Sequence, residues 1–151
     1  MEYRAVTDKL LDLCEQRAEE IAVRWFKAVV GNPKTPSYCF FPREKCLRQA
    51  VSLYKNLKPM FFAENAYQAV LQFLERASYV EDVHAAGIPL AEAIYALILL
   101  RRQIWLYADI QALFNTPLDM YQATESINRT LLLFDYAIYI VTSKYQELTR
   151  R

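Results

Sequence analysis

The chain has 151 residues, of which 54% are hydrophobic, and its net charge is +1 from 18 basic and 17 acidic side chains. This length suits one domain with a sizeable core, and the apolar content excludes a disordered chain. The only glycines are Gly31 and Gly87, which excludes glycine-rich phosphate loops and disfavours a turn-rich β fold. The balanced charge provides no general attraction to nucleic acid or to an anionic membrane.

Neither the start of the chain nor its cysteines indicate export. The N-terminal stretch MEYRAVTDKLLDLCEQ lacks an apolar signal core. The longest nearly uncharged run, 90–100, is shorter than the roughly 20 residues that span a bilayer. Cys14, Cys39 and Cys46 are odd in number and have no CxxC spacing, so we expect reduced thiols rather than a disulfide or zinc framework. The sequence therefore predicts a cytoplasmic protein that does not enter a membrane.

Helical periodicity begins near residue 5 and predicts an amphipathic helix over 5–30. Gly31 and Pro33 end it. The loop 31–42 contains three prolines, which favour an extended backbone. Its aromatic side chains are expected to cover the core, or alternatively to form a partner surface; they are Tyr38, Phe40 and Phe41.

Two further helices are predicted before residue 86. One begins at about Pro42 and is stopped or kinked at Pro59, and the apolar residues 60–62 then fill the space beneath the turn. The next covers about 64–85. Gly87 and Pro89 make a tight turn, so we expect helix 64–85 to pack antiparallel to the helix that follows.

The central element is the stretch 89–114, PLAEAIYALILLRRQIWLYADIQALF. Between Leu90 and Leu100 its only charge is Glu92, and a helix that is apolar nearly all round is expected to be buried. At 100° per residue one face collects Leu90, Ile94, Leu97, Ile104, Trp105 and Ala108. Arg101 lies in the middle of that face.

A guanidinium on a buried face needs a partner, because burying an unpaired charge is very costly. Glu81, Glu75 and Asp135 are the candidate carboxylates. Arg101 then forms an internal salt bridge or extends to the edge of the core, or it lines a pocket for an anionic or polar ligand. The pocket hypothesis comprises Arg101, Trp25, Tyr54, Tyr95, Trp105, Glu81 and His84.

The last predicted helix covers 117–150, with Thr116 and Pro117 suited to its start. Apolar residues from Met120 to Leu148 recur in alternating steps of four and three, which is a heptad seam. The seam either packs inside the bundle or pairs with a second chain and relays a signal. The residues assigned to this dimer or output role are Ile127, Leu131, Phe134, Ile138, Val141 and Tyr145.

No motif indicates catalysis or a metal site. His84 is the only histidine, so HxxxH and HExxH pairs are absent, and no GxSxG is present. We therefore expect neither an enzyme nor a bound cofactor. Two alternatives stay open: haem with His84 as axial ligand, and a reactive thiol at Cys39 or Cys46.

Several stretches together resemble the RsbRD N-terminal domain family, the helical input domains of RsbT co-antagonist proteins. They are residues 17–25 with Trp25 late in the first helix, Ser37-Tyr38, residues 85–95 leading to 99–105, and finally residues 133–136 and 144–147. The resemblance implies a bacterial sensory or regulatory module. Such domains precede outputs such as STAS domains or histidine kinases, so it also implies a partner protein in trans or an output domain on a longer chain.

The sequence thus predicts a single all-α domain over 1–151, a bundle of about five helices with 89–114 at its centre. The predicted function is signal input: binding a small ligand or a partner protein, and dimerising or signalling through helix 117–150. The alternative function is a ligand-free structural protein–protein interaction module, and a haem or thiol-based redox sensor is a further one.

Overall fold

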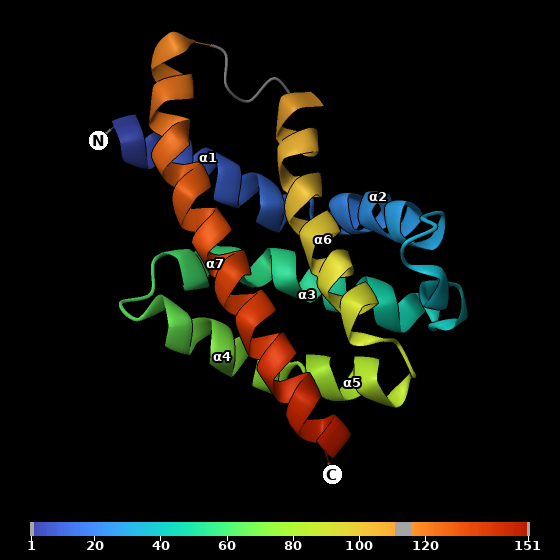
Figure 1. Cartoon of the computed structure of the whole chain (residues 1–151). Coiled ribbons are helices and arrows are strands. Elements are labelled where there is room, and N and C mark those ends of the chain that lie inside the picture. The colour runs from blue at the N-terminus through green and yellow to red at the C-terminus, as the bar shows by residue number, and fades with distance from the viewer. Residues whose placement is uncertain (1, 111–115, 151) are drawn as a thin grey trace.

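The all-α prediction is confirmed by the computed structural model of the chain, which describes residues 2–110 and 116–150 (Figure 1). Within those residues there is no strand. None of the described helices is long and apolar enough to cross a membrane. The described elements are α1 (Glu2–Gln16), α2 (Ala18–Val30), the 3-10 helix η1 (Pro36–Phe40), α3 (Arg43–Phe61), α4 (Ala66–Arg76), α5 (Tyr79–Ala85), α6 (Leu90–Ile110) and α7 (Pro117–Arg150).

The helices are arranged in crossing layers (Figure 1). Helices α6 and α7 contact each other and cross the others obliquely. Helices α1 and α2 both pack on α3, and α1 also contacts α7 while α2 contacts α6. Helices α4 and α5 lie against α7. Each helix thereby packs on at least one neighbour, which places the core at the centre of the molecule.

Two predicted helices are each divided, so the described residues form seven α-helices rather than five. The predicted helix 5–30 is interrupted at Arg17, whose φ of −112° and ψ of 23° leave the helical region. The predicted helix 64–85 is interrupted at Ser78, which has a left-handed φ of 52°. Neither break contains glycine or proline. The halves of the first share α3 but differ in a second neighbour, α7 for α1 and α6 for α2, and the halves of the second share α7 while α4 also contacts α3. Tertiary packing thus overrides local propensity.

The prolines have less effect than predicted. Helix α3 continues through Pro59 and ends at Phe61, so the expected stop at 58–59 was wrong by about half a turn. Residues 36–40 form a 3-10 helix instead of an extended loop. Tyr38 and Phe41 cover the core as expected, whereas Phe40 is 91% exposed.

The predicted tight turn before α6 is confirmed at Gly87, which has a φ of +76°. The N–H of Ile88 donates to the carbonyl of Val83, and the N–H of Gly87 donates to that of His84, which is a Schellman termination of α5. The antiparallel packing expected across this turn was wrong. The main contacts of α4 and α5 are with α7, because α5 is only seven residues long and α4 turns away at Ser78.

Helix α6 is central, but it is not buried on every side. Its core side carries Ala93, Ala96, Leu97, Leu100 and Ile104, all at most 2% exposed. An outer strip is half-exposed and contains Tyr95, Ile98, Arg101 and Trp105. Residues 111–114 of the predicted helix lie outside the described residues.

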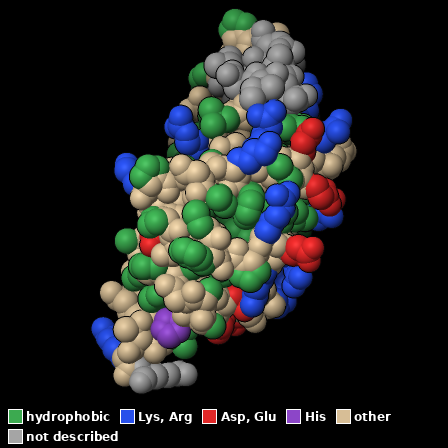
Figure 2. Space-filling view, turned by 90° about the vertical axis from the view of Figure 1, so that its right-hand side faces the viewer, with side chains coloured by type: hydrophobic (Ala, Val, Ile, Leu, Met, Phe, Trp, Pro, Cys, Tyr) green, Lys and Arg blue, Asp and Glu red, His purple; other side chains and the backbone are tan. Residues whose placement is uncertain are grey.

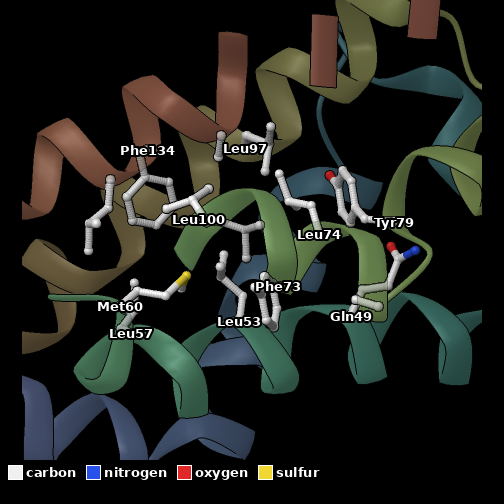
Figure 3. Close-up of a pocket in the computed structure, with 14 residues that line it drawn as sticks. Gln49, Leu53, Leu57, Met60, Phe73, Leu74, Tyr79, Leu97, Leu100 and Phe134 are labelled. Atoms are coloured by element: carbon white, nitrogen blue, oxygen red, sulfur yellow. The ribbon is translucent and has the colours of Figure 1, made fainter. Parts of the chain in front are cut away.

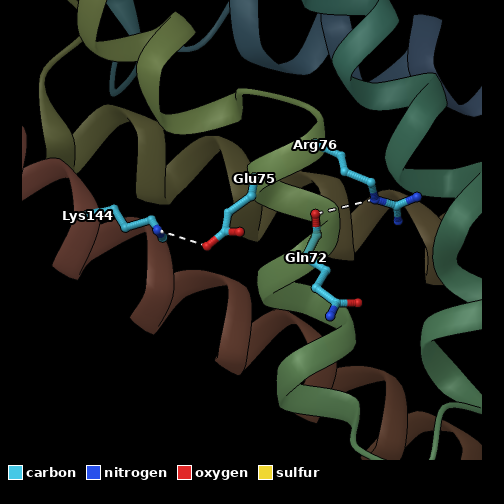
Figure 4. Close-up of polar contacts among 4 residues, drawn as sticks. All are labelled: Gln72, Glu75, Arg76 and Lys144. Atoms are coloured by element: carbon cyan, nitrogen blue, oxygen red, sulfur yellow. Dashed lines mark hydrogen bonds and ion pairs between the residues drawn. The ribbon is translucent and has the colours of Figure 1, made fainter.

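Exposed ion pairs join several of the helices at their edges. Lys144 Nζ of α7 lies 3.3 Å from a carboxylate oxygen of Glu75 in α4, beside Arg76, whose side chain turns back to the carbonyl of Gln72 (Figure 4). Lys45 pairs in the same way with Asp82. Each such exposed pair contributes about 0–1 kcal/mol, so the apolar core supplies most of the stability.

Ser78 provides a direct test of the α4–α5 junction. A left-handed conformation costs a non-glycine residue about 1–2 kcal/mol, and part of the gain from relieving it is offset by the larger unfolded-state entropy of glycine. We therefore expect Ser78→Gly to raise the free energy of unfolding in urea by about 0.5–1 kcal/mol. Ser78→Ala keeps the strain and should bring no gain; equal stabilisation by both variants would contradict the strained junction.

Candidate functional site

An apolar cavity lies between α3, α4, α6 and α7, and it is the strongest candidate site in the described part of the chain (Figure 3). Its free volume is about 20 Å³, which is room for about one water-sized group. The lining side chains are Gln49, Leu53, Leu57, Met60, Val70, Phe73, Leu74, Ala77, Tyr79, Leu97, Leu100, Leu133, Phe134 and Ala137.

The cavity has one polar end. Gln49 and Tyr79 lie together on one side, while Leu57, Met60 and Phe134 lie at the opposite side (Figure 3). The Gln49 amide nitrogen is buried and makes no hydrogen bond to any described residue. The hydroxyl of Tyr38, in η1, is likewise buried and makes no hydrogen bond to any described residue. It lies close enough to Tyr79 for each phenol to affect the pKa of the other, but not in a geometry that satisfies Tyr38.

The surroundings of the cavity are electrically neutral at physiological pH. Burial is the main cause that raises the pKa of Tyr79, and it raises the pKa of Tyr38 well above the ordinary value. Burial also raises the pKa of the neighbouring Cys46 thiol to about 12. None of the lining residues is acidic or basic. The site is therefore suited to an uncharged molecule.

The structure does not bring the predicted pocket residues together, and none of the seven lines this cavity. Trp25 and Tyr54 are buried, and their polar atoms are already satisfied by α6. Trp25 Nε1 donates to the carbonyl of Ala96 over 2.9 Å, and the Tyr54 hydroxyl donates to that of Leu100 over 2.8 Å. Both aromatic residues are anchors of the core.

The other members of the pocket hypothesis lie at the surface or at helix contacts. Tyr95 and Trp105 are half-buried on the outer strip of α6, and Glu81 is exposed. The ring of His84 packs edge-on against Tyr145 with centroids 5.0 Å apart, which joins α5 to α7. Haem ligation by His84 stays a prediction.

Arg101 lies at the edge of the predicted face rather than in its buried middle. Leu97, Ile104 and Ala108 of that face are at most 1% exposed, whereas Arg101 extends to the edge of the core, which was one of its two expected arrangements. Its side chain is 27% exposed, and its Nη1 lies 3.9 Å from Oδ1 of Asp135, which is 63% exposed. Asp135 was one of the three expected partners. Of the other two, Glu75 pairs with Lys144 instead. A separation of 3.9 Å is too long for a hydrogen bond, so this is a loose ion pair.

The heptad seam of α7 divides between core and surface. Phe134 and Val141 are buried, whereas Ile127, Leu131 and Ile138 are half-buried. Tyr145 is half-buried too, and its hydroxyl donates to the carbonyl of Ile88. The side chain of Met120 lies outside the described residues. The seam therefore packs within the chain along its C-terminal half, while its half-exposed members leave room for a second role.

Sequence reasoning missed an apolar stripe on the solvent side of α7. Leu118, Tyr121, Leu132 and Tyr139 are 49%, 80%, 43% and 64% exposed, and at 100° per residue they share a sector of about 60°. The seven-residue spacing of Leu132 and Tyr139 was the available signal. In Figure 2 hydrophobic side chains are spread over the middle and left of the visible face, while most acidic side chains lie along its right-hand edge.

Metal and thiol chemistry find little support in the described geometry. Among the described residues, no three His, Cys, Asp or Glu side chains converge where they could hold a metal ion. Burial raises the pKa of Cys14 to about 12, as it does for Cys46, and a protonated thiol is a poor nucleophile. Cys39 is exposed, and its sulfur lies 3.5 Å from the carbonyl of Val30.

Comparisons with known proteins identify no relative. No protein-family model matches the chain, no curated protein matches it, and no solved structure matches it.

If Tyr54 is an anchor rather than a ligand contact, its hydroxyl should matter for stability. We expect Tyr54→Phe to lower the free energy of unfolding by about 1–2 kcal/mol, because one buried hydrogen bond to α6 is lost. Urea denaturation measures this. Tyr139→Phe is the matched control, since Tyr139 is 64% exposed, and a loss of the same size there would remove the argument for the anchor.

The cavity should accept one additional methylene. Val70→Ile adds about that volume to the lining, and we expect it to raise the free energy of unfolding by up to about 0.8 kcal/mol. Val83→Ile is the control, because Val83 is fully buried but does not line the cavity. Overpacking there should cost about 1–3 kcal/mol. Destabilisation of similar size in both variants would mean that the cavity has no room for an added methylene at Val70.

Proposed function

We propose that this chain is a signal-input module that associates with a second copy of itself through the outer face of α6 and α7. The single observation that carries the proposal is the set of large apolar side chains on that face that stay partly or largely exposed, above all Leu132 and Tyr139, which are 43% and 64% exposed. A dimer through this face would join the input module to an output partner, in trans or on a longer chain, in a cytoplasmic setting. The resemblance to RsbRD N-terminal domains, made on the sequence alone, agrees with this role.

The outer face, as we use the term, comprises the half-exposed or exposed residues Tyr95, Ile98 and Trp105 of α6 and Leu131, Leu132, Ile138 and Tyr139 of α7. Apolar area removed from water contributes about 25 cal/mol per Å², so the gain on association would be largest for the most exposed members, Leu132 and Tyr139. Exposed large apolar side chains that gather on one face are typical of an interaction site. The aromatic residues on it are of the type that is enriched at interfaces.

The Arg101–Asp135 pair lies in the middle of the outer face and favours a second copy as the occupant. Leu131 and Ile138 are four and three residues from Asp135, and Ile98 is three residues from Arg101, so they flank the pair on the helix surfaces. The pair is loose and its carboxylate is mostly exposed, which leaves acceptor positions free. In a two-fold arrangement each Arg101 can meet the partner's carboxylate, because an isologous interface repeats every contact twice.

The small-ligand part of the input role rests on the cavity between α3, α4, α6 and α7. Without a ligand, the second candidate function is a structural interaction module that dimerises through the same face and responds to nothing. The observation that favours this alternative is the small free volume of the cavity, about 20 Å³. A measurement of ligand binding distinguishes the two functions, because only the input module binds a ligand.

A charge exchange between chains tests the dimer. Arg101→Glu and Asp135→Lys each place like charges together, so we expect each variant alone to weaken association about tenfold or more. Mixing the two variants should restore it, because the introduced glutamate of one chain then faces the introduced lysine of the other, while the native Arg101 faces the native Asp135. Analytical ultracentrifugation of the single variants and of their mixture gives the result.

The control reverses an ion pair away from the outer face. Lys144→Glu and Glu75→Lys disrupt the α4–α7 pair (Figure 4) and should leave association unchanged. A monomeric wild-type protein, or single variants that associate as tightly as the wild type, would contradict the proposed dimer. A chain that carries both Arg101→Glu and Asp135→Lys can also be tested. If association is restored in that chain but not in the mixture of single variants, the pair acts within one chain only.

A further inference from the structure

We infer that the cavity between α3, α4, α6 and α7 binds a small, neutral, mainly apolar molecule that carries one hydrogen-bond acceptor, which the side-chain amide of Gln49 recognises. The inference deepens the proposed input function by naming the class of ligand. It concerns the cavity alone, so it does not depend on whether the outer face of α6 and α7 dimerises.

The unsatisfied amide nitrogen of Gln49 carries the argument for an acceptor. Buried polar groups in folded proteins are nearly always hydrogen-bonded, and a donor left unsatisfied keeps the full penalty of its desolvation. Gln49 lies on α3 at the end of an otherwise apolar cavity, beside Tyr79 (Figure 3). A ligand oxygen placed there would accept a hydrogen bond from Nε2 and remove that penalty. A ligand without an acceptor would leave the amide as it is.

The lining excludes a charged ligand. A buried carboxylate or ammonium needs an opposite charge close by, and the fourteen lining residues include none. The opposite end of the cavity is formed by Leu57, Met60 and Phe134, which suits an alkyl chain or a small ring. A short-chain ketone, aldehyde, ester or amide matches the chemistry of both ends, whereas a fatty acid or an amine does not.

The present free volume of about 20 Å³ requires the wall to yield when such a molecule enters. Two parts of the wall can do so. Met60 has a flexible, unbranched side chain that fills irregular spaces. Ala77 and Tyr79 flank the strained left-handed Ser78, and strained residues cluster where a structure has to switch. Opening at this junction would widen the cavity next to Gln49.

Titration with 2-heptanone tests the inference, with heptanoate and heptylammonium as charged analogues of similar length. We expect 2-heptanone to shift the side-chain amide resonance of Gln49 in NMR spectra, and neither charged analogue to do so. Gln49→Met keeps the length of the side chain but removes the donor, and it should weaken 2-heptanone binding about fivefold. Gln72→Met, an exposed glutamine of α4 that does not line the cavity, should leave binding unchanged.

A second variant fills the site from its edge. Ala77 is only half-buried, so Ala77→Leu can extend into the cavity with little disturbance of the core, and it should abolish 2-heptanone binding. If this variant does not fold, Val70→Ile narrows the same space and should weaken binding. Tighter binding of heptanoate than of 2-heptanone, or binding unaffected by both Gln49→Met and the filling variant, would overturn the inference.

The two proposals fail separately. The variants Arg101→Glu and Asp135→Lys lie outside the cavity lining, so they should bind 2-heptanone as the wild type does even when they no longer associate. Conversely, loss of 2-heptanone binding in Gln49→Met should leave the association constant unchanged. Binding without dimerisation would overturn only the proposed dimer, and dimerisation without binding would overturn only the ligand site.

Discussion

Two hydrogen bonds from aromatic side chains to α6 fix the arrangement of the bundle. Trp25 of α2 and Tyr54 of α3 donate to the carbonyls of Ala96 and Leu100, which lie one helical turn apart. A carbonyl within a helix can accept a second hydrogen bond because it has two lone pairs. Both donors are almost completely buried, so sliding α2 or α3 along α6 would leave an unsatisfied polar group in the core. The register of three helices therefore depends on this pair of contacts, and exposed ion pairs at the edges add little to it.

The rotation of α6 about its axis explains which functional features could be predicted. Helical content, the Schellman turn at Gly87 and the start of α7 each follow from local residue types. A helix that is apolar nearly all round has no strong amphipathic direction, so periodicity could not decide which side of α6 faces the core. The predicted face put Arg101 in its buried middle, whereas the Arg101 side chain is 27% exposed and Trp105 is only partly buried against the core. The hypothesis of an arginine pocket depended on that choice.

The cavity and the two helix breaks lie beyond sequence reasoning for a related reason. Fourteen side chains from five helices and the α4–α5 connection line the cavity, and no local spacing connects Gln49 to Leu133 or Ala137. The interruptions at Arg17 and Ser78 have no glycine or proline to mark them. Each lets the two halves keep one shared neighbour while they take different second contacts, which is an effect of tertiary packing. The break at Ser78 also helps to form the cavity, because Ala77 and Tyr79 on either side of it lie in the cavity wall.

Helix α7 is the physical link between the two proposed sites. On its inner side Leu133, Phe134 and Ala137 line the cavity, and on its outer side Leu132, Asp135 and Tyr139 are exposed. These residues are interleaved within about two turns of one helix, so a shift of the whole of α7 would move both sites together, whereas a rotation of the Phe134 side chain alone would leave the outer face in place. The size of the response is limited by the difference in ligand affinity between the two positions of α7. The proposed input module would need no separate hinge domain, because the helix that lines the cavity would also present the proposed interface.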